Sequence, residues 1–172
     1  LDLSAFAYRQ LQLTDKDAIN TLASSLTQLD ILINNAGASF PGGKSEWEPD
    51  VFAEALDINL MSAFRLSHAC KLLLEKSKLP GGASIINISS MSGIMAVEMV
   101  PGYGTAKAGI IQMTRSLGQA WARNGIRTNA IAPGLIKTRM TKGFADDPEI
   151  CKPILKRTPL KRTGTAEEIA EV

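Results

Sequence analysis

The chain has 172 residues, of which 45% are hydrophobic and 21% charged, and its formal net charge is +2. This balance is typical of one soluble globular domain and argues against disorder. Basic residues are scattered and only 5% of residues are aromatic, so we expect no nucleic-acid partner. No apolar run approaches the roughly 18 residues that span a bilayer, so we expect no membrane partner. Cys70 and Cys151 lack CxxC spacing, which favours a reduced, cytoplasmic protein.

Predicted helices and strands alternate along the first half of the chain. The segment DKDAINTLASSL has helical periodicity, with Thr14 or Asp15 as its N-cap. The apolar run LDILINNAG is typical of a buried strand that meets a turn. Apolar residues at helical spacing then predict a long helix over 50–78, which the sequence PGG ends.

The second half continues the alternation. The segment ASIINISS predicts a second buried strand. Residues 102–124 predict a second long helix, which Asn124 and Gly125 end. The segment IRTNAIAPG predicts a third strand. Residues 138–158 predict an irregular or short-helical excursion suited to a lid, and Thr165 with Glu168 predicts a capping box at a last helix. The alternation predicts an α/β fold with a parallel sheet covered by helices on both faces.

Small or polar residues end all three predicted strands: Asn34 to Gly37, Ser89 with Ser90, and Pro133 with Gly134. Ligands of open α/β sheets bind outside the carboxyl ends of the strands, so we expect one site there. Tyr103 and Lys107 follow the second strand and share one face of a helix, with Cβ atoms about 5 to 6 Å apart. The pair alone is a weak signal, because an ordinary surface pair has the same spacing.

Five motifs occur in a fixed order: NNAG at 34–37, DINL at 57–60, IINISS at 85–90, YGTAK at 103–107 and NAIAPGLIKT at 129–138. In order and spacing they resemble the short-chain dehydrogenase/reductase family, from about Leu11 to Val172. The resemblance implies a Rossmann-like, doubly wound parallel sheet in a three-layer α/β/α arrangement. It also implies an NAD(P)-dependent oxidoreductase that interconverts a secondary alcohol and a ketone.

The resemblance implies a catalytic tetrad. Tyr103 matches the acid/base, and Lys107 matches the lysine that lowers the pKa of this tyrosine and holds the nicotinamide ribose. Ser90 matches the serine that binds the substrate oxygen, and Asn59 the asparagine that supports a proton-relay water. Hydride transfer at carbon leaves an oxygen that needs a proton, which is the work of the acid/base, while the nicotinamide carries the hydride.

Each tetrad assignment has an alternative in the residues themselves. Asn59 suits a solvated helix position, and Ser90 a cap at a strand end. Ser89 or Ser92 competes for the role of Ser90, but Tyr103 follows Ser90 by thirteen residues, and this spacing favours Ser90.

The resemblance also assigns residues to the cofactor and none to a metal. The cofactor residues include Tyr103 and Lys107. The resemblance places further cofactor residues on the adenosine side, namely Asn34, Ala36 and Gly37. Along the nicotinamide it places Pro133, Gly134, Ile136 and Thr138. Asn34 also suits a turn former.

Elementary electrostatics supports the expected pairing of Tyr103 with Lys107. A free phenol must lose about 4 kcal/mol of proton affinity to titrate near pH 7. One ammonium about 4 Å away supplies roughly that much at an effective dielectric constant of about 20. We therefore expect a lowered pKa for Tyr103.

The sequence departs from the family at both ends. The N-terminal strand with its glycine-rich turn and helix is absent, and so is the last C-terminal strand. We interpret residues 1–172 as a single dinucleotide-binding and catalytic domain, a partial chain of an ordinary enzyme rather than a truncated product. LDL at 1–3 suits the end of the family's second strand, where Asp2 would accept from the adenosine ribose and favour NAD over NADP. A simple loop aspartate is the alternative.

Two subclasses fit the expected chemistry: a 3-oxoacyl reductase-like enzyme and a polyol or sugar dehydrogenase-like enzyme. The substrate partner is a small alcohol or ketone. We expect a homo-oligomer, a dimer or tetramer, because helices 50–78 and 102–124 pair across subunits in this family. The competing function is a non-catalytic assembly subunit that keeps the fold.

Overall fold

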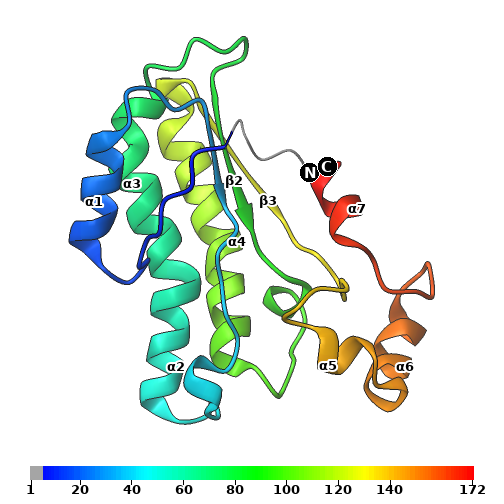
Figure 1. Cartoon of the computed structure of the whole chain (residues 1–172). Helices are drawn as coiled ribbons and strands as arrows, with labels where there is room; N and C mark the ends of the chain where they lie inside the picture. Colours follow the sequence, from blue (N-terminus) through cyan, green and yellow to red (C-terminus); the bar gives the residue numbers. More distant parts are fainter. Residues whose placement is uncertain (1–5) are drawn as a thin grey trace.

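The sheet at the centre of the molecule has three parallel strands. The computed structural model describes residues 6–172 (Figure 1). Strands β1 (Ile31–Asn34), β2 (Ala83–Ile88) and β3 (Ile126–Ile131) lie in the order β1-β2-β3. Asn34 pairs with Asn87, which pairs with Ala130, so the three carboxyl ends meet at one edge. The three predicted strands are confirmed.

Helices connect the strands. The first, α1 (Lys16–Ser25), begins after Asp15, whose carboxylate accepts the backbone N–H groups of Asp17 at 2.9 Å and Ala18 at 3.0 Å. The predicted helix 50–78 is α2 (Pro49–Leu56), a π-helical turn η2 (Asp57–Met61) and α3 (Ser62–Leu74). The predicted helix 102–124 is α4 (Pro101–Trp121) followed by the 3-10 turn η4 (Ala122–Asn124).

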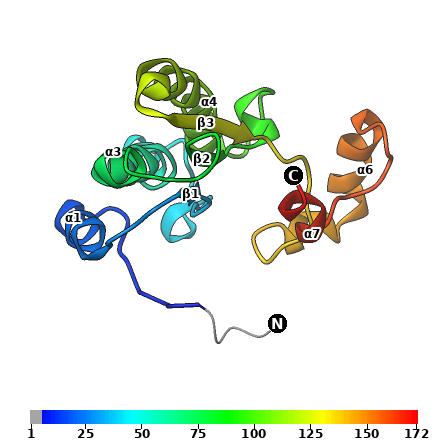
Figure 2. The same cartoon turned by 90° about the horizontal axis from the view of Figure 1, so that it is seen from above.

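The hydrophobic core lies between the sheet and one layer of helices. Figure 2 shows α1, α3 and α4 on the same side of the strands. Buried side chains from strands and helices interlock there: Ala23, Leu32, Cys70, Leu74, Ala83, Ile85, Leu117, Trp121 and Ile126. This packing fixes the helix that carries Tyr103 and Lys107 against the strands.

The opposite face of the sheet is exposed at β1 in the part of the chain that the structure describes. Ile31 is 50% exposed and Ile33 56%, whereas Leu32 between them is buried. Within residues 6–172, α1, α3 and α4 all pack on the face that buries Leu32, and this leaves Ile31 and Ile33 exposed on the other face of β1.

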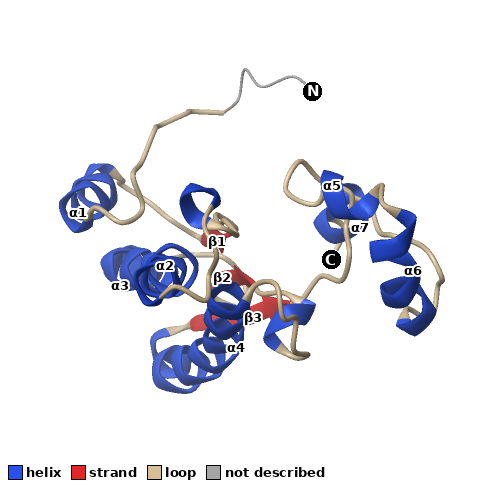
Figure 3. Cartoon of the chain, turned by 90° about the horizontal axis from the view of Figure 1, so that it is seen from below, coloured by secondary structure: helices blue, strands red, loops and turns tan. Residues whose placement is uncertain are grey.

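Beyond β3 the chain forms three short helices, α5 (Lys142–Ala145), α6 (Pro148–Arg157) and α7 (Ala166–Ala170). Figure 3 shows these three helices grouped apart from α1 to α4. A bridge between Ile136 and Gly164 joins the two ends of this excursion. The predicted short-helical excursion is confirmed, and so is the capping box of Thr165 and Glu168. No helix in residues 6–172 has the length and apolar character needed to cross a bilayer.

Candidate active site

The carboxyl ends of β2 and β3 stay paired beyond the last strand residues. The backbone N–H of Ser89 donates to the carbonyl of Ile131 at 2.7 Å, and that of Met91 donates to Pro133 at 2.9 Å. These bonds hold Ser90 beside Pro133. Two stretches that the sequence assigned to one site, 85–90 and 129–138, therefore lie side by side.

The first turns of α4 bring Tyr103 and Lys107 together. Proline at the first helical position suits a helix start, because its missing N–H would have no partner in the helix. The Lys107 Nζ lies 5.4 Å from the centre of the Tyr103 ring. The predicted pair on one helix face is therefore confirmed as geometry.

Lys107 is a buried amine with spare hydrogen-bonding capacity. It is 3% exposed, and its Nζ donates to the carbonyl of Ile88 at 2.7 Å. Burial disfavours the charged form and lowers the pKa of Lys107 to about 8. An ammonium has three donors, and only the bond to Ile88 is formed with the residues that the structure describes.

The pKa of Tyr103 is shifted in the opposite direction from the one predicted. Burial is the largest cause and raises the pKa of its phenol, because the phenolate loses solvation. A hydrogen bond with the Ser90 side chain lowers this pKa, and the negative charge of Glu46 raises it. The prediction of a lowered pKa is thus wrong for this structure, in which burial outweighs the neighbouring groups.

The three competing serines take different positions. The Ser90 hydroxyl bonds to Tyr103, and it accepts from the backbone N–H of Ser92 at 3.2 Å and from its hydroxyl at 2.9 Å. Ser89 is buried and donates to the carbonyl of Lys107 at 2.7 Å. Ser90 is therefore the serine at the phenol, with Ser92 behind it.

Asn59 lies in the π-helical turn and is 1% exposed. Its Nδ2 donates to the carbonyls of Ala38 at 2.7 Å and Ala55 at 2.9 Å, and its Oδ1 accepts the N–H of Ala38 at 3.0 Å. A Cβ on Gly37 would lie 2.7 Å from Asn59 Oδ1 and 3.4 Å from Lys107 Nζ. Gly37, Asn59 and Lys107 thus meet at one point, and the alternative of a solvated Asn59 is excluded.

The Asn34 side chain points into the core. Its Nδ2 donates to Ser67 Oγ at 2.9 Å and to Asn87 Oδ1 at 2.7 Å, and Asn87 in turn donates to Thr114 Oγ1 at 2.9 Å. This buried chain of hydrogen bonds ties β1 to β2, α3 and α4. Any contact of Asn34 with a cofactor would therefore come from its backbone.

The other residues assigned to the cofactor surround the same edge. Ala36 and Gly134 are exposed, and Pro133 and Ile136 are half-buried. Thr138 is exposed, and its backbone N–H donates to Thr141 Oγ1 at 3.0 Å. Asp2, the basis for preferring NAD, lies outside the described residues.

Glu46 is a residue of this site that the sequence reasoning missed. Its side chain is 0% exposed, and its two carboxylate oxygens accept the backbone N–H groups of Phe40 at 2.9 Å and Tyr103 at 2.8 Å. A single glutamate in a loop has no periodicity or spacing that would mark it.

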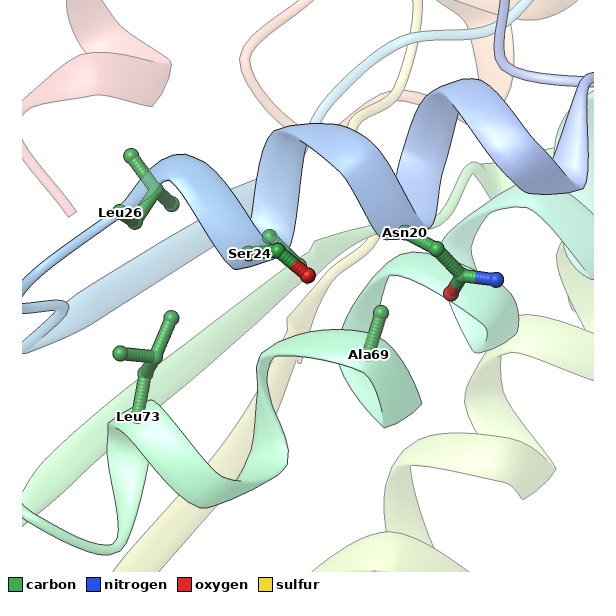
Figure 4. A pocket seen from close by; sticks show the side chains of 6 residues that line it. Asn20, Ser24, Leu26, Ala69 and Leu73 are labelled. Atoms are coloured by element: carbon green, nitrogen blue, oxygen red, sulfur yellow. The ribbon is translucent and has the colours of Figure 1, made fainter.

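A hollow between α1 and α3 lies away from this edge. It has a volume of about 380 Å³, and the labelled side chains of α1 and α3 face one another across it in Figure 4. Its lining residues are Asn20, Ala23, Ser24, Leu26, Ala69 and Leu73. None of them belongs to the predicted site. Residues 6–172 also contain no cluster of three or more His, Cys, Asp or Glu side chains that could hold a metal ion.

Comparison with known proteins identifies the class to which this fold and site belong. A family model described as enoyl-(acyl carrier protein) reductase matches residues 10–172. A tropinone reductase homologue of Arabidopsis thaliana is 37% identical over 145 residues, which cover 84% of this chain and 54% of the relative. A 2-dehydro-3-deoxy-D-gluconate 5-dehydrogenase of Bacillus subtilis is 36% identical over 163 residues, which cover 92% of this chain and 63% of the relative. The chain belongs to the short-chain dehydrogenase/reductase family.

The solved structures confirm the fold class. A gluconate 5-dehydrogenase from Burkholderia cenocepacia, in complex with NADP and tartrate, superimposes with a TM-score of 0.79 at 27% identity. The match covers 92% of this chain and 63% of that one. The Rossmann-like α/β fold predicted from the sequence is therefore confirmed. The chain spans about half to two thirds of the length of the relatives it matches.

The residues at the carboxyl edge fit a nicotinamide cofactor. Lys107 presents a buried ammonium with donors to spare, which suits the hydroxyl groups of a ribose. Gly37 allows the backbone to lie close against Asn59 and Lys107, because any side chain there would clash with Asn59 Oδ1 and approach Lys107 Nζ. These spare donors lie at the edge of the sheet where ligands of open α/β folds bind.

Proposed function

We propose that this protein is an NAD(P)-dependent oxidoreductase that interconverts a secondary alcohol and a ketone. The observation that carries the proposal is the convergence of Ser90, Tyr103 and Lys107 at the carboxyl edge of the sheet. A phenol, a hydroxyl bonded to it and an ammonium are the groups needed to hold a substrate oxygen and move one proton to or from it. The cofactor, when bound, supplies or accepts the hydride.

In this proposal Tyr103 is the proton carrier. Its raised pKa keeps the phenol protonated at neutral pH, which suits donation to a ketone oxygen in the reductive direction. Ser90 bonds to the phenol and holds the substrate oxygen beside it. Asn59 fixes the 37–38 backbone next to Lys107, and its support of a relay water remains part of the proposal.

Residues around the edge would hold the cofactor. Lys107 would bind the nicotinamide ribose, and the backbone of 34–37 would lie on the adenosine side. Pro133, Gly134, Ile136 and Thr138 would follow the nicotinamide. One relative's structure contains NADP, whereas our preference for NAD rests on Asp2 alone, so both cofactors belong in the test.

Two substrate classes stay open, and the names of two relatives support one of them. The names of two relatives, a gluconate 5-dehydrogenase and a 2-dehydro-3-deoxy-D-gluconate 5-dehydrogenase, support a sugar or sugar-acid substrate. The description of the matching family model supports an acyl-thioester substrate, as in a 3-oxoacyl reductase-like enzyme. We propose the sugar-acid class first.

The assembly proposed for the protein is a homo-oligomer formed through the long helices. Met61, Phe64 and Leu72 are exposed apolar residues on the 50–78 segment, and association would remove them from water. A single-domain, cytoplasmic enzyme remains our expectation, and the burial of Cys70 and Cys151 is compatible with a reducing compartment. The competing function, a non-catalytic assembly subunit, would need the same helices and no substrate.

Steady-state turnover tests the proposal. Oxidation of NADH and of NADPH is followed with a panel of keto sugar acids, 3-oxoacyl thioesters and simple ketones, and the wild type is compared with Ser90→Ala. We expect turnover with at least one ketone and a loss of about 100-fold or more in kcat/KM for Ser90→Ala. Oligomerisation without turnover on any member of the panel would favour the assembly subunit.

A further inference from the structure

Glu46 occupies a position that the proposed chemistry leaves unexplained. It is a fully buried carboxylate in the loop between β1 and α2, 57 residues before Tyr103 in the chain. Buried carboxylates are costly unless their oxygens accept good hydrogen bonds. Both oxygens do so: one accepts from Phe40 in the loop after β1, and the other accepts from Tyr103 in α4.

One bond of Glu46 caps the start of α4. The first N–H groups of a helix have no partner inside the helix, and Val100 at the N-cap provides no side-chain bond. Glu46 Oε2 accepts the N–H of Tyr103 at 2.8 Å, so a carboxylate from a distant loop supplies the cap. The negative charge also suits the positive end of the helix dipole.

The other bond of Glu46 holds a strained turn. Phe40 has a φ of 50°, a left-handed conformation that side chains other than glycine rarely adopt. Its N–H donates to Glu46 Oε1 at 2.9 Å, and its carbonyl accepts from Gly43 at 2.8 Å. The same loop carries Ala38, which Asn59 holds by two hydrogen bonds.

From these contacts we infer that Glu46 is a positioning residue, which locks the first turn of α4 to the loop after β1 and so sets the place and charge environment of Tyr103. The inference rests on the proposed function only in giving Tyr103 a catalytic role. The contacts themselves stand without it. A substitution at Glu46 should therefore alter the place and charge environment of Tyr103 more than it alters the rest of the fold.

Few ionisable groups face the Tyr103 phenol. Lys107 lies one turn along α4, and Glu46 lies behind the backbone N–H of Tyr103. The 3-10 turn η3 (Met91–Gly93), packed against α4, has no ionisable side chain. The remaining carboxylates on the packed elements are directed elsewhere: Asp50 and Glu54 of α2 are exposed, and Asp57 of η2 pairs with Arg65 at 2.7 Å.

The test uses the chain's two tyrosines. Tyr8→Phe leaves Tyr103 as the single tyrosine, so the absorbance of tyrosinate reports its titration alone. Glu46→Gln and Glu46→Asp are made in this background. The matched control is Glu48→Gln, which removes the same charge from an exposed position of the same loop whose side chain makes no capping bond.

We expect Glu46→Gln to lower the pKa of Tyr103 by roughly 0.5 to 1 unit, because removing a nearby negative charge stabilises the phenolate. The pH profile of ketone reduction, which needs the protonated phenol, should lose activity at correspondingly lower pH. Its kcat should fall about tenfold or more with KM within about twofold. Glu48→Gln should match the background in all three readouts.

An unchanged or raised pKa for Tyr103 in folded Glu46→Gln would overturn the inference. If that variant does not fold, Glu46→Asp decides, since it keeps the charge and withdraws the carboxylate by one methylene. A fall in its kcat at constant KM supports positioning, and an unchanged kcat overturns it. Absence of turnover in every form would refute the proposed function, while the tyrosinate titration would still decide the role of Glu46.

Discussion

The chemistry of this site depends on individual side chains held out of water. Lys107 keeps its amine beside Tyr103 and near Gly37 by a single bond to a strand carbonyl. Burial lowers its pKa from 10.5 to about 8. A group that is more acidic in the folded state than in the unfolded state makes stability depend on pH, and the direction of that dependence follows from proton counting.

Lys107→Met should change the pH dependence of stability in a defined way. Between about pH 8 and 10.5 the unfolded chain keeps a proton on Lys107 that the folded chain has released. Raising the pH therefore stabilises the wild type relative to the variant, by up to roughly 1.4 kcal/mol per pH unit. Denaturant unfolding of both proteins from pH 7 to 10 measures this difference. A gap that does not vary with pH would contradict a lowered pKa for Lys107.

The sequence predicted the residues of this site better than their electrostatics. The spacing of Ser90, Tyr103 and Lys107 along one strand and one helix determines that they meet. The direction of the Tyr103 pKa was predicted wrongly, because it depends on how deeply the phenol is buried, and no local pattern encodes this. Glu46 was missed for the same reason, since its partners are set by the tertiary fold.

At the scale of elements, the 3-10 turn η3 packs directly on the backbone of α4. A Cβ on Gly93 would lie 2.6 Å from the carbonyl carbon of Lys107 and 2.7 Å from the N of Ala108. Such distances leave no room for any side chain, and backbone atoms cannot move aside easily. The turn that follows Ser90 is thereby fixed against the helix that carries Tyr103.

Gly93→Ala should therefore disturb the site and the fold together. We expect a loss of roughly 1 to 3 kcal/mol in unfolding free energy, because η3 or α4 must shift. Gly143→Ala is the matched control, since a Cβ there meets nothing within 4 Å and alanine favours a helix. Thermal or urea unfolding compares the unfolding free energies of the two variants. Equal values would show that η3 can shift away from α4 at little cost, against this prediction.

The strands and helices were predicted from hydrophobic patterns, but the π-helical turn was not. Residues 50–78 have one continuous helical pattern, and the structure ends the helix at Leu74. The π-helical turn Asp57–Met61 is wider than an α-helical turn, and Asn59 within it forms hydrogen bonds with the backbone of Ala38. Those bonds come from a loop distant in sequence, so periodicity gives no signal of them.

At the scale of the whole molecule, two apolar surfaces lack a partner in the described chain. One is the sheet face with Ile31 and Ile33, and the other lies on the long helix with Met61, Phe64 and Leu72. The sequence predicted both the parallel sheet and the use of the long helix for association. In residues 6–172, α1, α3 and α4 all cover one face of this sheet, which is why Ile31 and Ile33 on the other face stay exposed.

Phe64→Glu tests the association proposed for the long helix. Phe64 is 39% exposed, so a charge there should be tolerated by the monomer and exclude an apolar interface. We expect light scattering after size-exclusion chromatography to show an oligomer for the wild type and smaller species for the variant. Leu160→Glu, at an apolar residue that is 72% exposed between α6 and α7, adds the same single charge and serves as the control. An oligomer unaffected by Phe64→Glu would place the interface elsewhere.

The most direct test of the central claim compares the two tyrosines of the chain. Tyr103→Phe removes the phenol hydroxyl bonded to Ser90, whereas Tyr8→Phe removes one from a residue that is 88% exposed. Ketone reduction and nicotinamide binding are measured for both variants. If Tyr103 carries the proton, kcat/KM falls about 100-fold or more in Tyr103→Phe, while cofactor binding and folding match Tyr8→Phe. Equal turnover in the two variants would contradict this account of the site.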